Sequence, residues 1–200
     1  DATYEDVCKV YQKGCKLITH LYSGMSTITR VNGFRKLGVI ESAYLLDDMM
    51  VEVIADGVHL PPELLLLVYK LKGDDKICLV TDSMRGAGMP DGPSVLGRRD
   101  EGLPCIIEDQ VAKLMDRSAF AGSIATADRL VRTFVRDVGI SVGSAVKMMT
   151  ENPAKVLGLS HKGKLKEGCD ADIILFDNQI NIQMVISLGE IVKNNNMLTY

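Results

Sequence analysis

Three short apolar runs rich in β-branched residues, spaced roughly 30 residues apart, constrain this chain more than any other feature of its sequence. They cover residues 16–20, 50–55 and 77–81, and segments of helical periodicity lie between them. Strand, helix, strand, helix, strand at this spacing is typical of a parallel βαβ sheet. We therefore expect an α/β fold, the alternative being three unrelated buried segments.

Helices are expected on either side of these runs. Apolar residues at three- and four-residue spacing predict a helix over residues 1–14, and residues 38–48 are compatible with a second. Pro61 and Pro62 stand where a third helix begins, in the turn that tolerates a missing N–H, and Gly73 ends it.

The second half of the chain has a different texture. Residues 86–118 are rich in Gly, Pro and Asp, and we expect an inserted loop and hairpin there. Two amphipathic helices are predicted at 125–138 and 141–150, the second ending near Asn152-Pro153. Beyond Leu159 the pattern is that of strands without helices between them, which predicts a small separate β-layer. Its expected pieces are residues 163–168, 171–177, 182–188 and 189–193.

Composition excludes several classes of protein. Hydrophobic residues make up 46% and charged residues 24% of the 200 positions, so the chain is not disordered as a whole. A net charge of -3 gives no basic footprint for nucleic acid. Neither a membrane-spanning run nor a signal peptide is evident, and we expect a cytoplasmic protein without nucleic-acid or membrane partners. Five scattered cysteines without a CxxC pair predict free thiols.

Three polar residues with catalytic chemistry stand at or shortly after the predicted strands. His20 closes the first run, His59 follows the second, and Asp82 follows the third. Side chains at the carboxyl ends of parallel strands line the active sites of α/β folds, and His and Asp serve hydrolytic metal sites. The alternatives stay open: a hydrogen-bonded structural histidine, or an aspartate that caps a turn.

Other candidate residues have plainer alternatives. Arg30, in a predicted loop, can clamp an anionic group or be an ordinary surface arginine. The segment 120–123 precedes a predicted helix, so its N–H groups can receive an anion, or Ser123 can simply be the N-cap. Asp56 is interpreted as a turn residue.

Six motifs follow one another along the chain. They are THLYSGM (19–25), IADGVHLPP (54–62), LVTDSM (79–84), FAGS (120–123), NPAKVLGL (152–159) and GKLKEGCDADIILFD (163–177). Together they resemble the N-acetylglucosamine-6-phosphate deacetylase family of the amidohydrolase superfamily, from residue 1 to about residue 192. The first three motifs together are quite specific, whereas the last is shared by many amidohydrolases.

This resemblance implies a fold and a reaction. The fold is a metal-dependent (β/α)8 TIM barrel with a small β-sandwich domain. Residues 1–158 would be the C-terminal part of the barrel with an inserted hairpin, and residues 159–200 would be strands of the small β domain. The reaction is hydrolysis of N-acetylglucosamine 6-phosphate to glucosamine 6-phosphate and acetate.

The resemblance also implies roles for particular residues. The active site would hold one or two divalent metal ions of the zinc, iron or manganese class, and His20 would be a ligand of one of them. Asp82 would be the general base and later the acid, and His59 would hydrogen-bond the substrate carbonyl. Arg30 would reach the phosphate of the amino-sugar phosphate across a homodimer interface. The sugar would be held by Ser23, Gly24 and the backbone of Phe120, Ala121 and Gly122.

The chain also departs from that family. Ser23-Gly24 stands where the family usually has Asn-Ala, and Val31 stands where an acidic residue commonly follows the arginine. A complete barrel takes about 250 residues, and the family's metal-binding glutamate and first metal-binding histidine are absent. We therefore expect a C-terminal fragment that is inactive, or nearly so, on its own.

Two rival hypotheses stand beside the deacetylase. One is another amidohydrolase, similar to dihydroorotase or adenine deaminase, although the LVTDSM and ADGVH motifs favour the sugar deacetylase. The other is a non-catalytic remnant that binds a sugar phosphate or a partner, which Ser23, Val31 and the missing first half favour.

Overall fold

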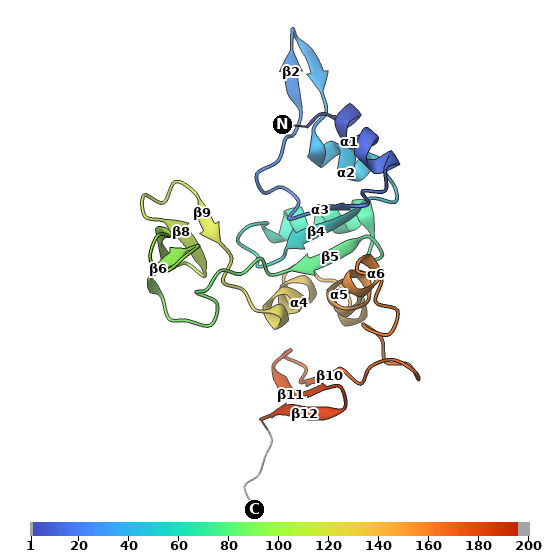
Figure 1. Ribbon diagram of the computed structural model, residues 1–200, viewed down its shortest axis with the longest axis vertical. Coiled ribbons are helices and arrows are strands. Elements are labelled where there is room, and N and C mark those ends of the chain that lie inside the picture. Colours follow the sequence, from blue (N-terminus) through green and yellow to red (C-terminus); the bar gives the residue numbers. More distant parts are fainter. Residues whose placement is uncertain (1, 196–200) are drawn as a thin grey trace, which may run out of the picture.

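The computed structural model describes residues 2–195 and has a three-stranded parallel sheet at its centre (Figure 1). The strands are β1 (Leu17–Ile18), β4 (Met50–Ile54) and β5 (Ile77–Val80), in the order β1-β4-β5. Leu17 pairs with Met50, and Val51 pairs with Ile77. The predicted parallel βαβ arrangement is confirmed, with β1 shorter than the predicted run.

Local sequence explains where the first helices begin and end. The structure has α1 (Tyr4–Gln12), α2 (Val39–Leu45) and α3 (Pro62–Lys72). Thr3 caps α1 by accepting from the backbone N–H of Asp6, whose carboxylate accepts the N–H of Thr3 in return. In α3, Pro62 occupies the first turn and Gly73 adopts a φ of 66° just beyond the end, as expected.

The core lies between the parallel sheet and the helices that pack on it. Helices α4 (Ala127–Arg136) and α5 (Val142–Met149) contact β5, and α3 contacts α4. The largest fully buried side chains are apolar and come from both layers. They include Leu21, Val51, Val53, Ile77, Leu130, Phe134 and Met148.

The segment after His20 contains a hairpin that was expected to be a loop. Strands β2 (Thr29–Val31) and β3 (Phe34–Lys36) pair antiparallel, and they project beyond α1 and α2 in Figure 1. Asn32 and Gly33 connect them with φ values of 50° and 85°. An Asn-Gly pair at positive φ forms the two-residue turn that joins twisted strands, so this pair indicated the hairpin.

The inserted segment is larger than the predicted loop and hairpin. It forms a four-stranded antiparallel sheet of β6 (Gly92–Leu96), β7 (Leu103–Glu108), β8 (Val111–Leu114) and β9 (Phe120–Gly122). This sheet has a small core of its own, with Cys105 and Ile107 buried. A parallel bridge between Ser83 and Ser123 joins its last strand to the chain leaving β5.

The helix predicted at 141–150 is α5, which ends at Met149, close to the expected end near Asn152-Pro153, but a further helix that was not predicted follows it. Helix α6 (Glu151–Val156) begins directly after α5 and runs through both residues. Pro153 lies in the first turn of α6, where a missing N–H breaks no helical hydrogen bond. The buried Asn152 amide donates to the carbonyl of Ile77 at 2.6 Å, which ties α6 to the start of β5.

The C-terminal part forms a separate antiparallel sheet, as expected. Its strands are β10 (Ile173–Phe176), β11 (Ile182–Ser187) and β12 (Glu190–Asn194), whereas residues 163–168 are not a strand. Arg132 of α4 donates to the carbonyl of Ile180, whose side chain joins the main core. An apolar cleft of about 770 Å³ remains between this sheet and helices α4 to α6. Residues 196–200 of the predicted small β domain, like Asp1, lie outside the described residues.

Two further expectations concern thiols and membranes. All five cysteines are free, as predicted. Within residues 2–195, no helix combines the length and the apolar character that a bilayer crossing requires.

Candidate active site

The three strand-end residues lie at one edge of the central sheet. His20 lies two residues after β1, His59 five residues after β4, and Asp82 two residues after β5. Because these strands are parallel neighbours, their carboxyl ends meet at the same edge. The edge on which ligands bind in open α/β sheets therefore carries two imidazoles and one carboxylate.

His59 is held by an acidic residue in its own loop. The carboxylate oxygen Oδ2 of Asp56 lies 2.7 Å from Nδ1 of His59, and Oδ1 accepts the backbone N–H of Val58 and of His59 at 2.9 and 2.8 Å. The Asp56 side chain is fully buried, and that of His59 is 9% exposed. Asp56 is therefore the predicted turn residue and in addition the partner of the His59 ring.

The turn that contains Asp56 is stabilised by the ionised Asp56 carboxylate and by Arg129 of helix α4. Burial raises the pKa of Asp56, but the hydrogen bonds from the His59 ring and from the two backbone N–H groups outweigh it and lower the pKa below its ordinary value. The carboxylate is therefore ionised at neutral pH. Arg129 of α4 also donates to the backbone carbonyl of Asp56 at 2.7 Å and to that of Gln110 at 3.1 Å.

His20 has no such partner. Its ring is half-buried, and among residues 2–195 its Nδ1 is a buried polar atom without any hydrogen bond. The backbone N–H of the next residue, Leu21, donates to the carbonyl of Glu52 at 2.8 Å, which fixes this turn against β4. A buried ring nitrogen without a partner is costly in a protein unless something else binds it.

Two of the three strand-end residues adopt an unusual backbone conformation. His20 has a φ of 24° and Asp82 a φ of 45°. Non-glycine residues at positive φ are uncommon, and such strain concentrates at functional sites. Both turns therefore direct the chain, at some energetic cost, away from the regular continuation of a strand.

Strand β9 brings the FAGS segment to this edge. The backbone N–H of Met84, two residues after Asp82, donates to the carbonyl of Ser123 at 2.9 Å. Gly122 has a φ of 121°, and a Cβ atom there would lie 3.4 Å from Cβ of Met84. The Phe120 ring lies 4.9 Å from the His59 ring, centroid to centroid. Phe120, Ala121 and Gly122 thus lie beside both His59 and the turn of Asp82.

The expected relation of this segment to the next helix is wrong. Helix α4 has Thr126 as its N-cap, three residues beyond Ser123, so the N–H groups of 120–123 do not form a helix N-terminus. Ser123 is fully buried, and its hydroxyl accepts the backbone N–H of Ala125 at 3.0 Å. The segment is a strand because it pairs with β8.

Of the residues expected to contact the substrate from the segment after His20, Ser23 and Gly24 stay close to His20 in the chain, whereas Arg30 lies on a separate hairpin. Ser23 and Gly24 lie three and four residues after His20, and the N–H of Ser23 donates to the carbonyl of His20 at 2.9 Å. Arg30 lies on the exposed hairpin strand β2, directly opposite Arg35 of β3. The hairpin projects away from the carboxyl edge in Figure 1. Arg30 is therefore not brought together with His59 and Asp82 of its own chain.

The residues described here do not by themselves hold a metal ion. Catalytic zinc sites, for example, have three protein ligands and one open position. The unpartnered Nδ1 of His20 fits a ligand atom, but within residues 2–195 no three His, Cys, Asp or Glu side chains are grouped closely enough to hold a metal ion. Among residues 2–195, this edge therefore offers the free Nδ1 of His20 and too few further donor side chains for a metal site.

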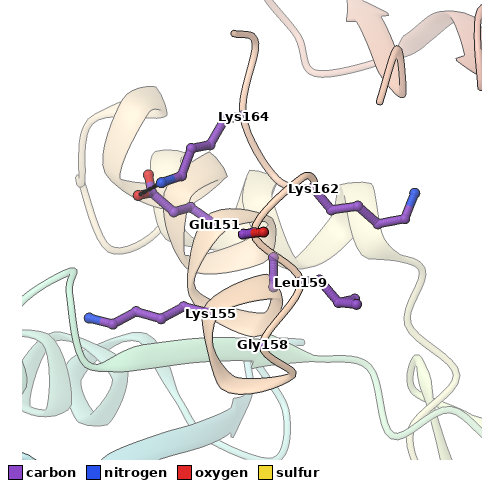
Figure 2. A pocket seen from close by; sticks show the side chains of 8 residues that line it. Glu151, Lys155, Gly158, Leu159, Lys162 and Lys164 are labelled. Carbon is purple, nitrogen blue, oxygen red and sulfur yellow. Dashed lines mark ion pairs between the residues drawn. The ribbon is translucent and has the colours of Figure 1, made fainter. Parts of the chain in front are cut away.

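A second hollow lies beside α6 and is a poorer candidate (Figure 2). Its volume is about 250 Å³, and three of its lining residues are Lys155, Lys162 and Lys164. Lys164 pairs with Glu151 at 3.1 Å, and Lys162 pairs with two aspartates. Because α6 is tied to the amino end of β5, this hollow lies away from the carboxyl edge, where α/β folds place their chemistry.

Sequence reasoning missed two contributors to the site. Asp56 was assigned to a turn alone, although its spacing of three residues from His59 allows a side-chain contact across that turn. Arg129 lies 73 positions from Asp56, and nothing in the sequence points to their contact.

Comparison with known proteins gives a consistent result. The model of the amidohydrolase family matches residues 1–192. An N-acetylglucosamine-6-phosphate deacetylase of Lysinibacillus sphaericus is 36% identical over 197 residues, covering 98% of this chain and 49% of that protein. The chain spans about half the length of the curated relatives it matches.

Solved structures of the same kind superpose well. The N-acetylglucosamine-6-phosphate deacetylase of Thermotoga maritima matches with a TM-score of 0.87 and 37% identity, over 96% of this chain and 51% of that one. A mutant of the Mycobacterium smegmatis enzyme, solved in complex with N-acetyl-D-glucosamine-6-phosphate, matches with a TM-score of 0.84 and 29% identity over 95% of this chain and 49% of that one.

Proposed function

Because this chain belongs to the amidohydrolase family, we propose that it is the C-terminal part of a deacetylase of amino-sugar phosphates. The proposed reaction converts N-acetylglucosamine 6-phosphate and water to glucosamine 6-phosphate and acetate. The observation that carries this proposal is that His20, His59 and Asp82 lie at one edge of the sheet. The chain is also 36% identical to such a deacetylase over 98% of its own residues.

Asp82 is proposed to move the proton. Its side chain is exposed at the carboxyl edge, where it can reach a water molecule and a bound amide. As the water attacks the amide carbon, the Asp82 carboxylate takes its proton, and it then delivers that proton to the nitrogen as the C–N bond breaks. A carboxylate that alternates between base and acid leaves the protein unchanged after each turnover.

His59 is proposed to hydrogen-bond the substrate carbonyl oxygen. With Nδ1 bound to Asp56, the free nitrogen is Nε2, which donates to the oxygen on which negative charge develops when the ring carries both protons. The backbone of Phe120–Gly122 and the loop with Ser23 and Gly24 are proposed to hold the sugar. Arg30 lies on the β2–β3 hairpin, which projects away from this edge in Figure 1, and it is proposed to bind the phosphate of the substrate held by a partner chain in a homodimer.

A divalent cation is proposed as the cofactor of the complete protein. Zinc, iron and manganese all accept histidine and carboxylate ligands. Such a cation lowers the pKa of a bound water from about 15.7 towards roughly 7 and polarises an amide oxygen. His20 would contribute one ligand, and the remaining ligands must come from outside the described residues, because these hold no complete cluster.

The architecture is proposed on the same grounds. Residues 1–158 would form the last strands and helices of a (β/α)8 barrel that carries the inserted sheet β6–β9. Residues 159–200 would contribute strands to a smaller β domain. The good superposition on the Thermotoga maritima structure, over half of that chain, supports this division.

The test is turnover by the protein as its source makes it, with acetate and ammonia release measured on a panel of amidohydrolase substrates. We expect acetate from N-acetylglucosamine 6-phosphate and no ammonia from adenine. Asp82→Asn should lower kcat by roughly 10²- to 10⁴-fold while leaving the free energy of unfolding nearly unchanged, because the side chain is exposed. Unchanged turnover in Asp82→Asn would remove this residue from the mechanism.

The same panel separates the rival hypotheses. Ammonia release, or hydrolysis of dihydroorotate, would favour another amidohydrolase. Binding of the sugar phosphate without any turnover would favour a non-catalytic remnant. The departures at Ser23, Gly24 and Val31 can then be examined by restoring Asn, Ala and an acidic residue at these positions.

A further inference from the structure

We propose that Asp56 is a positioning residue for the reaction, which acts through His59 by fixing the protonation and orientation of its ring. This inference rests on the proposed function, because it assigns His59 to the substrate carbonyl. It goes beyond that function in giving a chemical role to a residue that otherwise only shapes a turn.

The two carboxylate oxygens of Asp56 have different hydrogen-bond partners. Oδ1 accepts the backbone N–H groups of Val58 and His59, which closes the turn after β4. Oδ2 is left for the His59 ring, 2.7 Å from Nδ1. A residue needed only for the turn would be complete with the first oxygen, so the second contact adds something that the backbone does not require.

The partner of the ring is a carboxylate, and this decides which nitrogen carries the proton. An ionised carboxylate only accepts hydrogen bonds, so Nδ1 must be the protonated nitrogen of His59. In the singly protonated ring Nε2 then has a lone pair and cannot donate. It donates to a carbonyl oxygen only when the ring carries both protons, and a buried carboxylate at this distance is the partner that such a cation needs.

The surroundings leave the ring little freedom to turn. Its side chain is 9% exposed, and the Phe120 ring lies against it at 4.9 Å. Arg129 anchors the carbonyl of Asp56 from α4, so the turn is held from a distant part of the chain. With Nδ1 directed into the turn and held there, Nε2 is the atom left for the substrate.

The experiment combines ¹⁵N NMR of the histidine rings with steady-state kinetics, both on the protein as its source makes it. The His59 signals are assigned by their loss in His59→Asn. In the unmodified protein we expect Nδ1 to be protonated. Asp56→Asn keeps an oxygen for the two backbone N–H groups but offers an N–H to the ring, so Nδ1 should lose its proton and the single proton of the neutral ring should be on Nε2.

The kinetic consequence follows from the lost charge. In Asp56→Asn the ring still donates to the oxyanion but without a carboxylate behind it. We expect kcat to fall by about 10-fold or more, short of the ~10²- to 10³-fold loss typical of removing an oxyanion donor altogether. KM should change little, because the interaction strengthens only in the transition state.

A matched control and a double variant make the test specific. Asp177 accepts the backbone N–H groups of Gln179 and Asn181 in a similar turn, with no histidine beside it. Asp177→Asn should leave the His59 spectrum and kcat unchanged. Adding Asp56→Asn to His59→Asn should cause no further loss of kcat, because Asp56 acts only through His59.

Three results would overturn the proposal. They are an unprotonated Nδ1 in the unmodified protein, an Asp56→Asn variant with unchanged tautomer and kcat, or full additivity in the double variant. The first needs no variant and holds even if Asp56→Asn does not fold. Absence of acetate release by the unmodified protein would instead overturn the proposed reaction, since the proton on Nδ1 is observed without turnover.

Discussion

The loops that follow β1 and β4 present a histidine at the same edge of the sheet in opposite states. In the loop after β4, the Nδ1 of His59 is bound to a buried carboxylate, which two backbone N–H groups also contact. In the loop after β1, the Nδ1 of His20 is buried and has no partner among the described residues. The loop after β4 thus supplies a hydrogen-bond partner for its own histidine, whereas the loop after β1 does not.

This difference indicates which chemistry each histidine can perform. A ring whose protonation is set within its own loop suits the repeated donation of a hydrogen bond. A ring with a free buried nitrogen suits a cation, since metal ligation uses the unprotonated nitrogen. The two proposed roles therefore follow from whether an acceptor lies beside Nδ1, as it does for His59 and does not for His20, rather than from the position after a strand.

The largest expected effect comes from removing the two rings in turn. His20→Asn should weaken retention of the divalent cation by about 10²-fold or more, beyond the 10- to 100-fold cost of losing an outer partner of a ligand. His59→Asn should retain the cation and lose about 10²- to 10³-fold in kcat. Metal content by elemental analysis, together with turnover, checks both. Equal metal content in the two variants would contradict the comparison.

A middle-sized effect is expected from the arginine that supports the loop after β4. Arg129→Met removes two hydrogen bonds from a charged donor to the carbonyls of Asp56 and Gln110. The free energy of unfolding should fall by about 1–3 kcal/mol, measured by denaturant titration. Arg98→Met, which removes an exposed arginine that pairs with Asp100, should cause no measurable change. If Arg98→Met lowered the free energy of unfolding and Arg129→Met did not, the loop after β4 would not depend on its contact with α4.

The sequence predicts the parts of this fold that obey a simple period. The three β-branched runs predict β1, β4 and β5, and Pro61, Pro62 and Gly73 predict the bounds of α3, because apolar patterning and backbone restriction are local properties. From this alone, the placement of the two histidines and the aspartate at one edge follows.

Other parts could not be predicted in the same way. The sequence predicts a loop and one hairpin where β6 to β9 form a four-stranded sheet, because partly exposed strands lack a clear alternation of apolar residues. Helix α6 tolerates Pro153 only because α5 ends directly before it. The contact of Asp56 with His59 depends on a side-chain orientation that the turn motif leaves open. That His20 has no partner is a property of packing, which no spacing of residues reveals.

The smallest expected effect is a change in how stability depends on pH. The pKa of Asp56 is lowered in the folded protein from an ordinary value of 3.8. Its stabilising contribution is therefore complete above about pH 4 and is lost as the pH falls through the lowered pKa. The amide in Asp56→Asn does not titrate, so the difference in unfolding free energy between the two proteins should narrow as the pH falls from about 4 through the lowered pKa.

Denaturant unfolding at several pH values measures this difference directly. The other carboxylates whose pKa is lowered, such as Asp48 and Asp75, are present in both proteins, so their contributions cancel. A constant difference across this range would mean that Asp56 is no better stabilised as an anion than in the unfolded chain. The carboxylate beside His59 would then not stabilise the loop after β4, and this loop would no longer differ in that respect from the loop of His20.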